Sequence, residues 1–293
     1  MYVPSSKVIK VFASGLKGLR TVQGLSSKSK DLIVIIGKDL NVQNDFSTEI
    51  EIFCTNENIN FSYGKHKSNN KFGLAVAAGW QRMIYDVPSH ALIVFHDSLL
   101  PKYRGFNPLV TALLNEDDTV GVTALTAAEK YDCGDIIAQI KIPIFYPILI
   151  STAIEKVAEA YFEISKEIYE RFVKEHLIGQ PQNNELATYS LWRDEFDYRI
   201  DWSLSAEKIQ LLVNSVGYPY LGASTILNDD LIRIKKVTLI DDLMIENRTT
   251  GKIIFFDEKM PVVVCGKGLI RLDLMETNDG KLFIVEKMRT RFK

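Results

Sequence analysis

The chain has 293 residues, of which 46% are hydrophobic and 25% charged, and its formal net charge is −2 at pH 7. This composition is ordinary for a globular protein, and the near-neutral charge argues against a nucleic-acid partner. No apolar run approaches the ~20 residues of a membrane span, and the N-terminus lacks a signal-peptide layout, so we expect a cytoplasmic protein without a membrane partner. Three scattered cysteines, four histidines and no CxxC motif predict neither a disulfide framework nor a metal site.

The first half of the chain contains short apolar runs rich in β-branched residues. They are nearly continuous rather than alternating, which is typical of strands covered on both faces. The six runs span 8–13, 31–37, 72–78, 91–96, 119–125 and 135–142. Helical spacing follows Pro108, with Asn107 as N-cap, and recurs near 151–176. We therefore predict an α/β domain with a doubly wound, mostly parallel sheet.

The second half changes character after a polar, turn-rich stretch at 179–190 that reads as a linker or strap. One helix is predicted from a cap at Ser205 to Gly217. Short strands then follow at 223–227, 231–240, 251–256, 261–266, 269–275 and 281–288. This pattern favours a small β-barrel-like or sandwich domain. We expect domains at 1–179 and 200–293, joined by a linker at 180–199.

His96 stands where the apolar run 91–96 ends and a basic, proline-bounded loop begins. In open α/β sheets ligands bind beyond the carboxyl ends of the strands. An imidazole there can act as a general acid or base near neutral pH. The alternative is a histidine that only hydrogen-bonds to the backbone.

Two other segments could meet the same sheet edge. Asp132, in the stretch YDCGDI, could pair with His96 and orient its ring, or could serve only as a turn residue. In VAAGWQRMI, residues 76–84, a strand stops at a glycine, and the following loop could present backbone groups to a flat heterocycle. Trp80 and Met83 would then form apolar walls.

Together these motifs resemble the formyltetrahydrofolate-dependent formyltransferases. The pattern HxSLLPxYRG, then GVT, then DxGxI is matched by His96, Ser98–Pro101, Tyr103–Gly105, Gly121–Thr123, Asp132, Gly134 and Ile136. In the second half, RIDWSLSAEKI and YPYLGAS look like the entry to the C-terminal domain of the methionyl-tRNA formyltransferase group. The resemblance therefore covers nearly the whole chain.

The resemblance implies an enzyme that takes a formyl group from N10-formyltetrahydrofolate and needs no metal. It implies acid–base and oxyanion work for His96, supported by Asp132. Pterin contacts fall to the first loop and to a second one that closes over the ring, namely Trp80, Gln81, Arg82, Met83, Ile84, Ala128, Glu129, Tyr131 and Asp132. Candidate contacts to the acceptor are Tyr103, Arg104, Phe106, Lys65 and Lys67.

The sequence departs from the family at two positions. Val94 stands where the family has an asparagine that donates to the formyl oxygen, and loss of such a donor costs on the order of a hundredfold in rate. Asn107 is an alternative donor, although helix capping also explains it. Phe106 stands where the related aminoarabinose formyltransferase has an arginine. A non-catalytic folate- or sugar-binding homologue is therefore the alternative to an enzyme, but a protein freed from catalysis would not need both His96 and Asp132.

The acceptor is inferred from charge and domain content. From Asp201 to Lys293 there are 14 lysine and arginine and 13 acidic residues, so this half lacks the basic bias that a tRNA-binding domain should show. A purine-precursor formyltransferase would lack the β-rich second half. The resemblance is therefore nearest to the two-domain sugar N-formyltransferases of bacterial surface-polysaccharide synthesis, with a nucleotide-linked amino sugar as acceptor and methionyl-tRNA as the alternative. The sequence leaves the oligomeric state open, a homodimer included.

Overall fold

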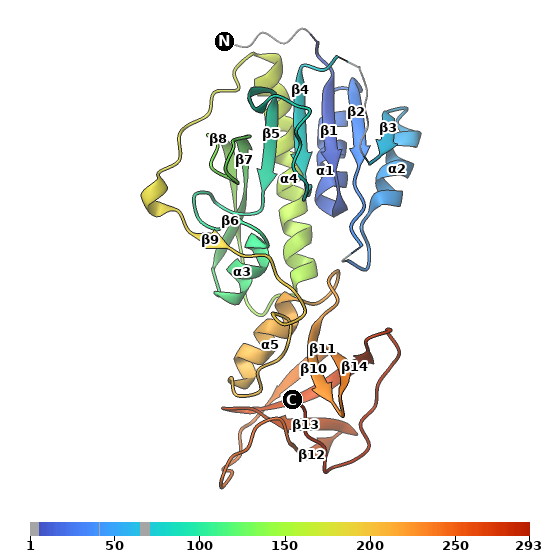
Figure 1. Ribbon diagram of the computed structural model, residues 1–293, viewed down its shortest axis with the longest axis vertical. Coiled ribbons are helices and arrows are strands. Elements are labelled where there is room, and N and C mark those ends of the chain that lie inside the picture. Colours follow the sequence, from blue (N-terminus) through green and yellow to red (C-terminus); the bar gives the residue numbers. More distant parts are fainter. Residues whose placement is uncertain (1–5, 41, 65–70) are drawn as a thin grey trace. The chain divides into compact units, whose positions relative to one another are not determined.

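The computed structural model describes residues 6–40, 42–64 and 71–293, and it divides into two compact units (Figure 1). The first consists of residues 1–112, 116–145 and 152–192, and the second of 113–115, 146–151 and 193–293. The stretch that we expected to be a linker, 180–199, is shared between them. Among the described residues, no helix combines the length and the apolar character needed to cross a bilayer.

The first unit is built on a seven-stranded sheet in the order β3-β2-β1-β4-β5-β7-β8. The first five strands in this order pair in parallel, whereas β7 pairs antiparallel with both of its neighbours, β5 and β8. Their bounds are β1 Ile9–Ala13, β2 Leu32–Ile36, β3 Asn60–Tyr63, β4 Leu74–Ala78, β5 Leu92–His96, β7 Thr119–Thr126 and β8 Ile136–Pro143. The six predicted strands are thus confirmed, and the strand order reverses direction between β1 and β4, as a doubly wound sheet requires.

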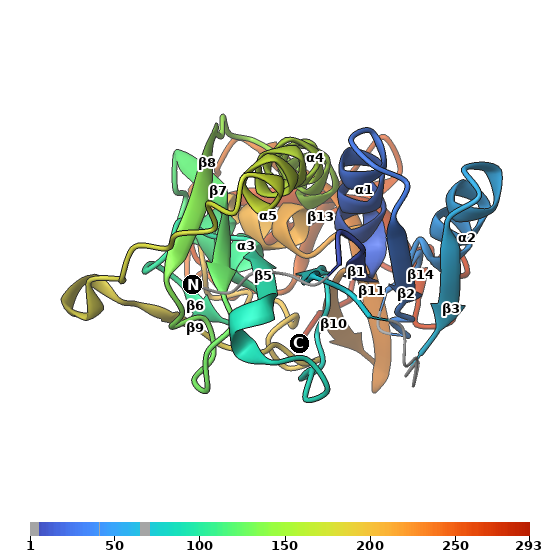
Figure 2. The same ribbon diagram turned by 90° about the horizontal axis from the view of Figure 1, so that it is seen from above.

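Helices cover one face of this sheet. Figures 1 and 2 show α1 (Gly15–Ser26), α2 (Ser47–Asn56) and α4 (Ile150–Val173) on the same side of the strands. The predicted long helix is α4, and α3 (Pro108–Leu114) begins at the predicted proline. The opposite face carries Phe12, Ile35 and Ala77, which pack against the connection from β4 to β5. That connection is irregular except for one 3-10 turn, η1 (Ser89–Ala91).

The second unit contains α5 (Ala206–Ser215) and an antiparallel sheet in the order β10-β11-β14-β13-β12. The strands are β10 Ala223–Leu227, β11 Asp230–Ile240, β12 Ile253–Asp257, β13 Met260–Val264 and β14 Leu269–Thr277. Ser205 caps α5 as predicted, since its side chain accepts from the Lys208 N–H. The tail pairs with both edge strands: Lys293 with Ile226 of β10, and Thr290 with Ile253 of β12. The C-terminal tail thus connects the two edges of the sheet, as in the small barrel-like domain that the sequence predicts.

One predicted strand is wrong. Residues 281–288 pair with β14 only through an isolated antiparallel bridge between Glu276 and Leu282, made by backbone bonds from Thr277 N to Lys281 O and from Phe283 N to Met275 O. Val285 is buried, but Leu282 and Ile284 stay largely exposed. The apolar run therefore begins an antiparallel pairing with the end of β14 that stops after one bridge, and hydrophobicity alone could not reveal where the pairing stops.

Candidate active site

His96 is the last residue of β5, and the fold buries its ring. Side chains alternate along a strand, so His96 shares a face with Val94, whereas Phe95 faces α4, where its ring contacts Tyr161 at 5.5 Å. The imidazole is 8% exposed. Its Nε2 lies 2.8 Å from the carbonyl oxygen of Tyr103, and its Nδ1 lies 3.5 Å from Oδ1 of Asp132. The expected pairing of His96 with Asp132 is present.

The geometry commits the two ring nitrogens differently. A carbonyl oxygen can only accept, so Nε2 carries a proton and donates to Tyr103. Nδ1 then faces a carboxylate, and two lone pairs would repel each other unless one proton lies on the ring or on the acid. Of the two nitrogens, Nδ1 is therefore the one at which a proton can be held or passed on.

Asp132 reaches the ring from the loop between β7 and β8. Its backbone is left-handed, with φ 54°, and its Oδ2 accepts from the Gly105 N–H at 2.8 Å. Gly134 allows the loop to close, since a Cβ there would lie 1.7 Å from the Thr126 carbonyl oxygen. The aspartate and the glycine of the DxG motif are thus both explained by local geometry.

The loop after His96 is anchored by side chains of the antiparallel strands. Thr123 donates to the Ser98 carbonyl at 2.6 Å and accepts from the Leu100 N–H at 3.1 Å. The Gln139 amide donates to the Leu100 carbonyl and to the Thr123 hydroxyl, both at 2.9 Å. These bonds give the threonine of the GVT motif a structural role beside the histidine.

An ion pair that the sequence did not predict lies directly behind His96. Asp97 accepts from Lys17 of α1 and from the hydroxyl of Tyr161 of α4. Burial by itself raises the pKa of the Asp97 carboxyl, but the Lys17 ammonium and the two hydrogen bonds outweigh burial and hold that pKa below its ordinary value. Burial and the neighbouring Asp97 charge raise the pKa of Tyr161 well above its ordinary range. No sequence spacing links these three positions.

The first expected pterin segment begins where β4 ends, at the point of strand-order reversal. The Trp80 ring packs on Phe12 with centroids 5.2 Å apart, and Ile84 packs on the same cluster. Gln81, Arg82 and Met83 between them are exposed, and the Gln81 side chain donates to Asp39 at 3.0 Å. The segment thus has apolar side chains at its two ends, Trp80 and Ile84, and exposed residues between them.

Val94 belongs to that same apolar wall. It is half-buried and packs against the cluster, as do Trp80, Ile84 and Ala127. The position at which the family has a polar amide is therefore continuous here with hydrophobic neighbours.

The remaining candidate residues occupy different environments. Ala128, Glu129 and Tyr131 are exposed on the loop before Asp132, and the Tyr131 ring lies 5.7 Å from that of Phe106. Tyr103 and Arg104 are buried, and the Arg104 guanidinium donates to Gln182 and Asn184. Lys65 and Lys67 lie outside the described residues.

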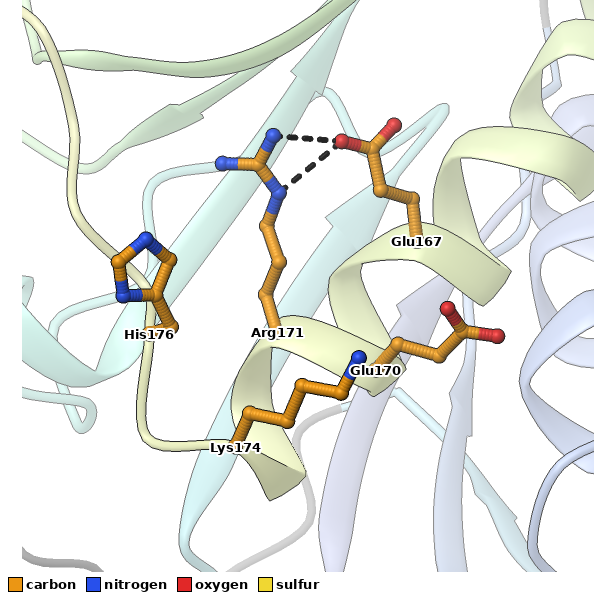
Figure 3. Close-up of a pocket in the computed structure, with 5 residues that line it drawn as sticks. All are labelled: Glu167, Glu170, Arg171, Lys174 and His176. Carbon is orange, nitrogen blue, oxygen red and sulfur yellow. Dashed lines mark hydrogen bonds and ion pairs between the residues drawn. The ribbon is translucent and has the colours of Figure 1, made fainter.

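A surface cleft of about 530 Å³ lies at the end of α4 (Figure 3) and shares no lining residue with this site. Arg171 donates to Glu167 from Nε at 2.9 Å and from Nη2 at 2.7 Å, and Glu170 accepts from Lys28 at 2.7 Å. These charges are partly or fully exposed and paired, as on an ordinary solvated helix end. Nor do three His, Cys, Asp or Glu side chains gather anywhere in the described part of the chain in a way that could hold a metal ion.

Comparisons with known proteins agree with this architecture. Residues 52–169 match the family described as formyl transferase, and residues 194–292 match the formyl transferase C-terminal domain. The methionyl-tRNA formyltransferase of Thermodesulfovibrio yellowstonii is 31% identical over 221 residues, which are 75% of this chain and 70% of the relative.

Solved structures with the same fold are more distant in sequence. An N-formyltransferase from Helicobacter canadensis, in complex with folinic acid and dTDP-3-aminofucose, has a TM-score of 0.66 at 16% identity and covers 95% of this chain and 100% of its own. HypX from Aquifex aeolicus, in complex with tetrahydrofolic acid, has a TM-score of 0.65 at 18% identity and covers 92% of this chain and 44% of its own.

Proposed function

The chain belongs to the formyl transferase family, and from this premise we propose that it transfers the formyl group of N10-formyltetrahydrofolate to the amine of a nucleotide-linked amino sugar. The observation that carries the proposal is the buried His96–Asp132 pair at the carboxyl end of β5. We propose residues 1–179 as the catalytic region, with 180–199 connecting it to the region 200–293.

The residues at the first expected pterin segment fit a folate. Trp80, Ile84 and Val94 are partly buried and pack on the same apolar cluster, which suits a flat heterocycle. The indole N–H of Trp80 is buried without a hydrogen-bond partner among the described residues. Gln81 to Met83 are exposed residues outside helices and strands, and we infer that their backbone groups would offer donors and acceptors to a ring edge. When bound, the folate would supply the formyl carbon that the amine attacks.

His96 and Asp132 would manage the charge that develops during this attack. The amine must lose a proton, and the formyl oxygen gains negative charge until the bond between the formyl carbon and N10 breaks; N10 then takes up a proton and tetrahydrofolate leaves. Because Nε2 is committed to the Tyr103 carbonyl, the proton would be exchanged at Nδ1, which faces the Asp132 carboxylate. The Gly105 N–H keeps the carboxylate oriented by holding its other oxygen.

The choice of acceptor rests on the charge of residues 201–293 and on the ligand bound in a solved structure with the same fold. The near-balanced charge of residues 201–293 supports a small acceptor over a tRNA. The Helicobacter canadensis structure, solved with a nucleotide-linked amino sugar, supports the same class. A role in surface-polysaccharide synthesis would follow from such a substrate. The sequence similarity to methionyl-tRNA formyltransferases favours methionyl-tRNA as the second candidate.

The test is a transfer assay with both acceptor classes. Purified protein is incubated with N10-formyltetrahydrofolate and either a panel of nucleotide-linked amino sugars or methionyl-tRNA, and release of tetrahydrofolate is followed. We expect release that depends on one amino sugar. Release only with the tRNA would replace the sugar by the second candidate, and no release with either would overturn the proposed function.

Folate binding is tested separately by calorimetry with 5-formyltetrahydrofolate. We expect binding that is weakened by Trp80→Ala, because the indole forms part of the apolar wall. Absence of heat at millimolar folate would contradict the proposed pterin site.

A further inference from the structure

The polar stretch from Gln180 to Ser190 forms hydrogen bonds with both loops of the candidate active site. One is the loop after His96 and the other is the loop that carries Asp132. The stretch starts in antiparallel register with β8, where Gln180 and Ile136 exchange two backbone hydrogen bonds of 2.8 Å. It ends as β9 (Tyr189–Ser190), which pairs in parallel with β6 (Arg104–Gly105). We call residues 180–190 the strap. Composition suggested a linker, but every one of these contacts lies within the first unit.

Gln182 joins the two loops through a single amide. Its Nε2 donates to the Asp132 carbonyl at 2.8 Å and to the Gly134 carbonyl at 2.7 Å. Its Oε1 accepts from Nε and Nη2 of Arg104 at 3.1 and 2.7 Å. The Gln182 amide therefore uses its donors and its acceptor at the same time. Its Nε2 binds the loop that carries Asp132, and its Oε1 binds the loop after His96.

Thr188 holds the other partner of His96. Its hydroxyl accepts from the Tyr103 N–H at 2.9 Å, and its carbonyl accepts from the Arg104 N–H at 2.8 Å. Tyr103 is the residue whose carbonyl receives the His96 Nε2 proton. Each nitrogen of the imidazole thus faces a group whose own backbone is bound to the strap.

Both of these partners have a backbone conformation that L-residues rarely adopt. Tyr103 has φ 60° and Asp132 has φ 54°, in the left-handed region. Non-glycine residues remain there only when their surroundings hold them, and such positions cluster at functional sites. The strap supplies hydrogen bonds at both positions.

We propose that Gln182 and Thr188 are positioning residues, which hold Asp132 and the Tyr103 carbonyl in place against the two nitrogens of His96. The buried Arg104 guanidinium acts with them by clamping Gln182 and Asn184. The proposal depends on the proposed function only for its kinetic readout, because the geometry around His96 can be measured without substrate.

Ring-nitrogen resonances of His96 provide that substrate-free measurement. The chain has four histidines, and His96→Asn identifies the signal in ¹⁵N-histidine-labelled protein. We expect the His96 resonances to move in Gln182→Ala and in Thr188→Val. They should stay in place in Gln180→Ala, a matched control in which the strap amide that is removed is exposed and its residue pairs through the backbone.

Kinetics on the accepted substrate then separate positioning from folding. We expect kcat to fall about 10- to 100-fold in Gln182→Ala and Thr188→Val, with KM for both substrates changed less than about threefold, since misplaced groups cost rate rather than binding. Thr188→Ser should recover most of the rate because it restores the hydroxyl. Gln182→Glu should not recover it, because a carboxylate would face the Asp132 and Gly134 carbonyls.

The outcomes are distinct. Unmoved His96 resonances in both Gln182→Ala and Thr188→Val would overturn the proposal, as would movement of the same size in Gln180→Ala. If Gln182→Ala fails to fold, Thr188→Val with its serine rescue decides alone. A protein that transfers no formyl group, yet shows the expected shifts, would refute the proposed function and leave the strap's role intact.

Discussion

The two units differ in the kinds of polar group that they bury. In the second unit, the Arg233 guanidinium, 5% exposed, donates to Asn278 at 3.1 and 2.8 Å and pairs with Glu195 at 2.7 Å. The Trp202 indole donates to Thr225 at 3.0 Å. Guanidinium and indole groups keep their protons at any working pH, so these contacts close a scaffold and offer no acid or base.

The first unit also buries an imidazole, which unlike a guanidinium can act as an acid or a base. His96 faces Asp132, and Asp97 next to it is paired with Lys17 and Tyr161. Burial of a charge therefore does not by itself identify a catalytic group. What distinguishes the two units is whether the partners can change protonation and whether they lie at the carboxyl end of a parallel strand.

The largest expected effect is loss of the pair itself. His96→Ala and Asp132→Asn should each lower kcat about 10²- to 10⁴-fold, the range for loss of a positioned acid or base. His96 ends a strand and Asp132 lies in a loop, so the circular dichroism spectrum should stay native. Turnover near that of the wild type in either variant would remove His96 and Asp132 from the catalytic assignment.

The contrasting change is made in the second unit. Arg233→Met removes a buried charge and leaves Glu195 and Asn278 without their partner, so we expect a loss of about 2–4 kcal/mol in the free energy of unfolding. Denaturant melts measure this loss. At a temperature where the variant is folded, kcat should match that of the wild type. A hundredfold lower kcat would contradict the purely structural role of Arg233.

The ion pair behind His96 should appear in the acid dependence of stability. The pKa of Asp97 is lowered in the folded protein, so its contribution is present above its unfolded value of 3.8 and is lost as pH falls through the folded pKa. In Asp97→Asn that contribution is absent. The difference in unfolding free energy between wild type and variant should therefore be constant above about pH 5 and shrink below pH 3.8. A difference independent of pH down to acid unfolding would contradict the role of the carboxylate charge.

The smallest expected effect is at Val94. Its side chain packs against the same buried apolar cluster as Trp80 and Ile84, so an amide there would cost about 1–3 kcal/mol if it found no partner. We expect Val94→Asn to raise turnover less than about tenfold, because the site is adapted to an apolar side chain. A gain of a hundredfold on the same acceptor would instead mean that the wild-type enzyme simply lacks a donor.

Much of the fold was predictable because its cause is local. Continuous apolar runs mark buried strands, and Pro108 and Ser205 mark helix starts through the lack or capture of backbone N–H groups. The prediction of a strand at 281–288 was wrong because it used only this local signal. A strand also needs a partner, and the apolar pattern of its own residues does not reveal one. Two domains and the histidine at the end of β5 follow from the sequence alone.

Tertiary structure decided how the site is held. The ordered motifs brought His96 and Asp132 into consideration, but Gln182, Thr188, Lys17 and Tyr161 carry no motif, and their contacts span dozens of residues along the chain. Such contacts depend on which side chains the folded backbone brings within about 3 Å of each other, and neither periodicity nor composition encodes that. The sequence therefore determines which groups can do the chemistry, and the three-dimensional packing of the loops, helices and strap determines how those groups are oriented.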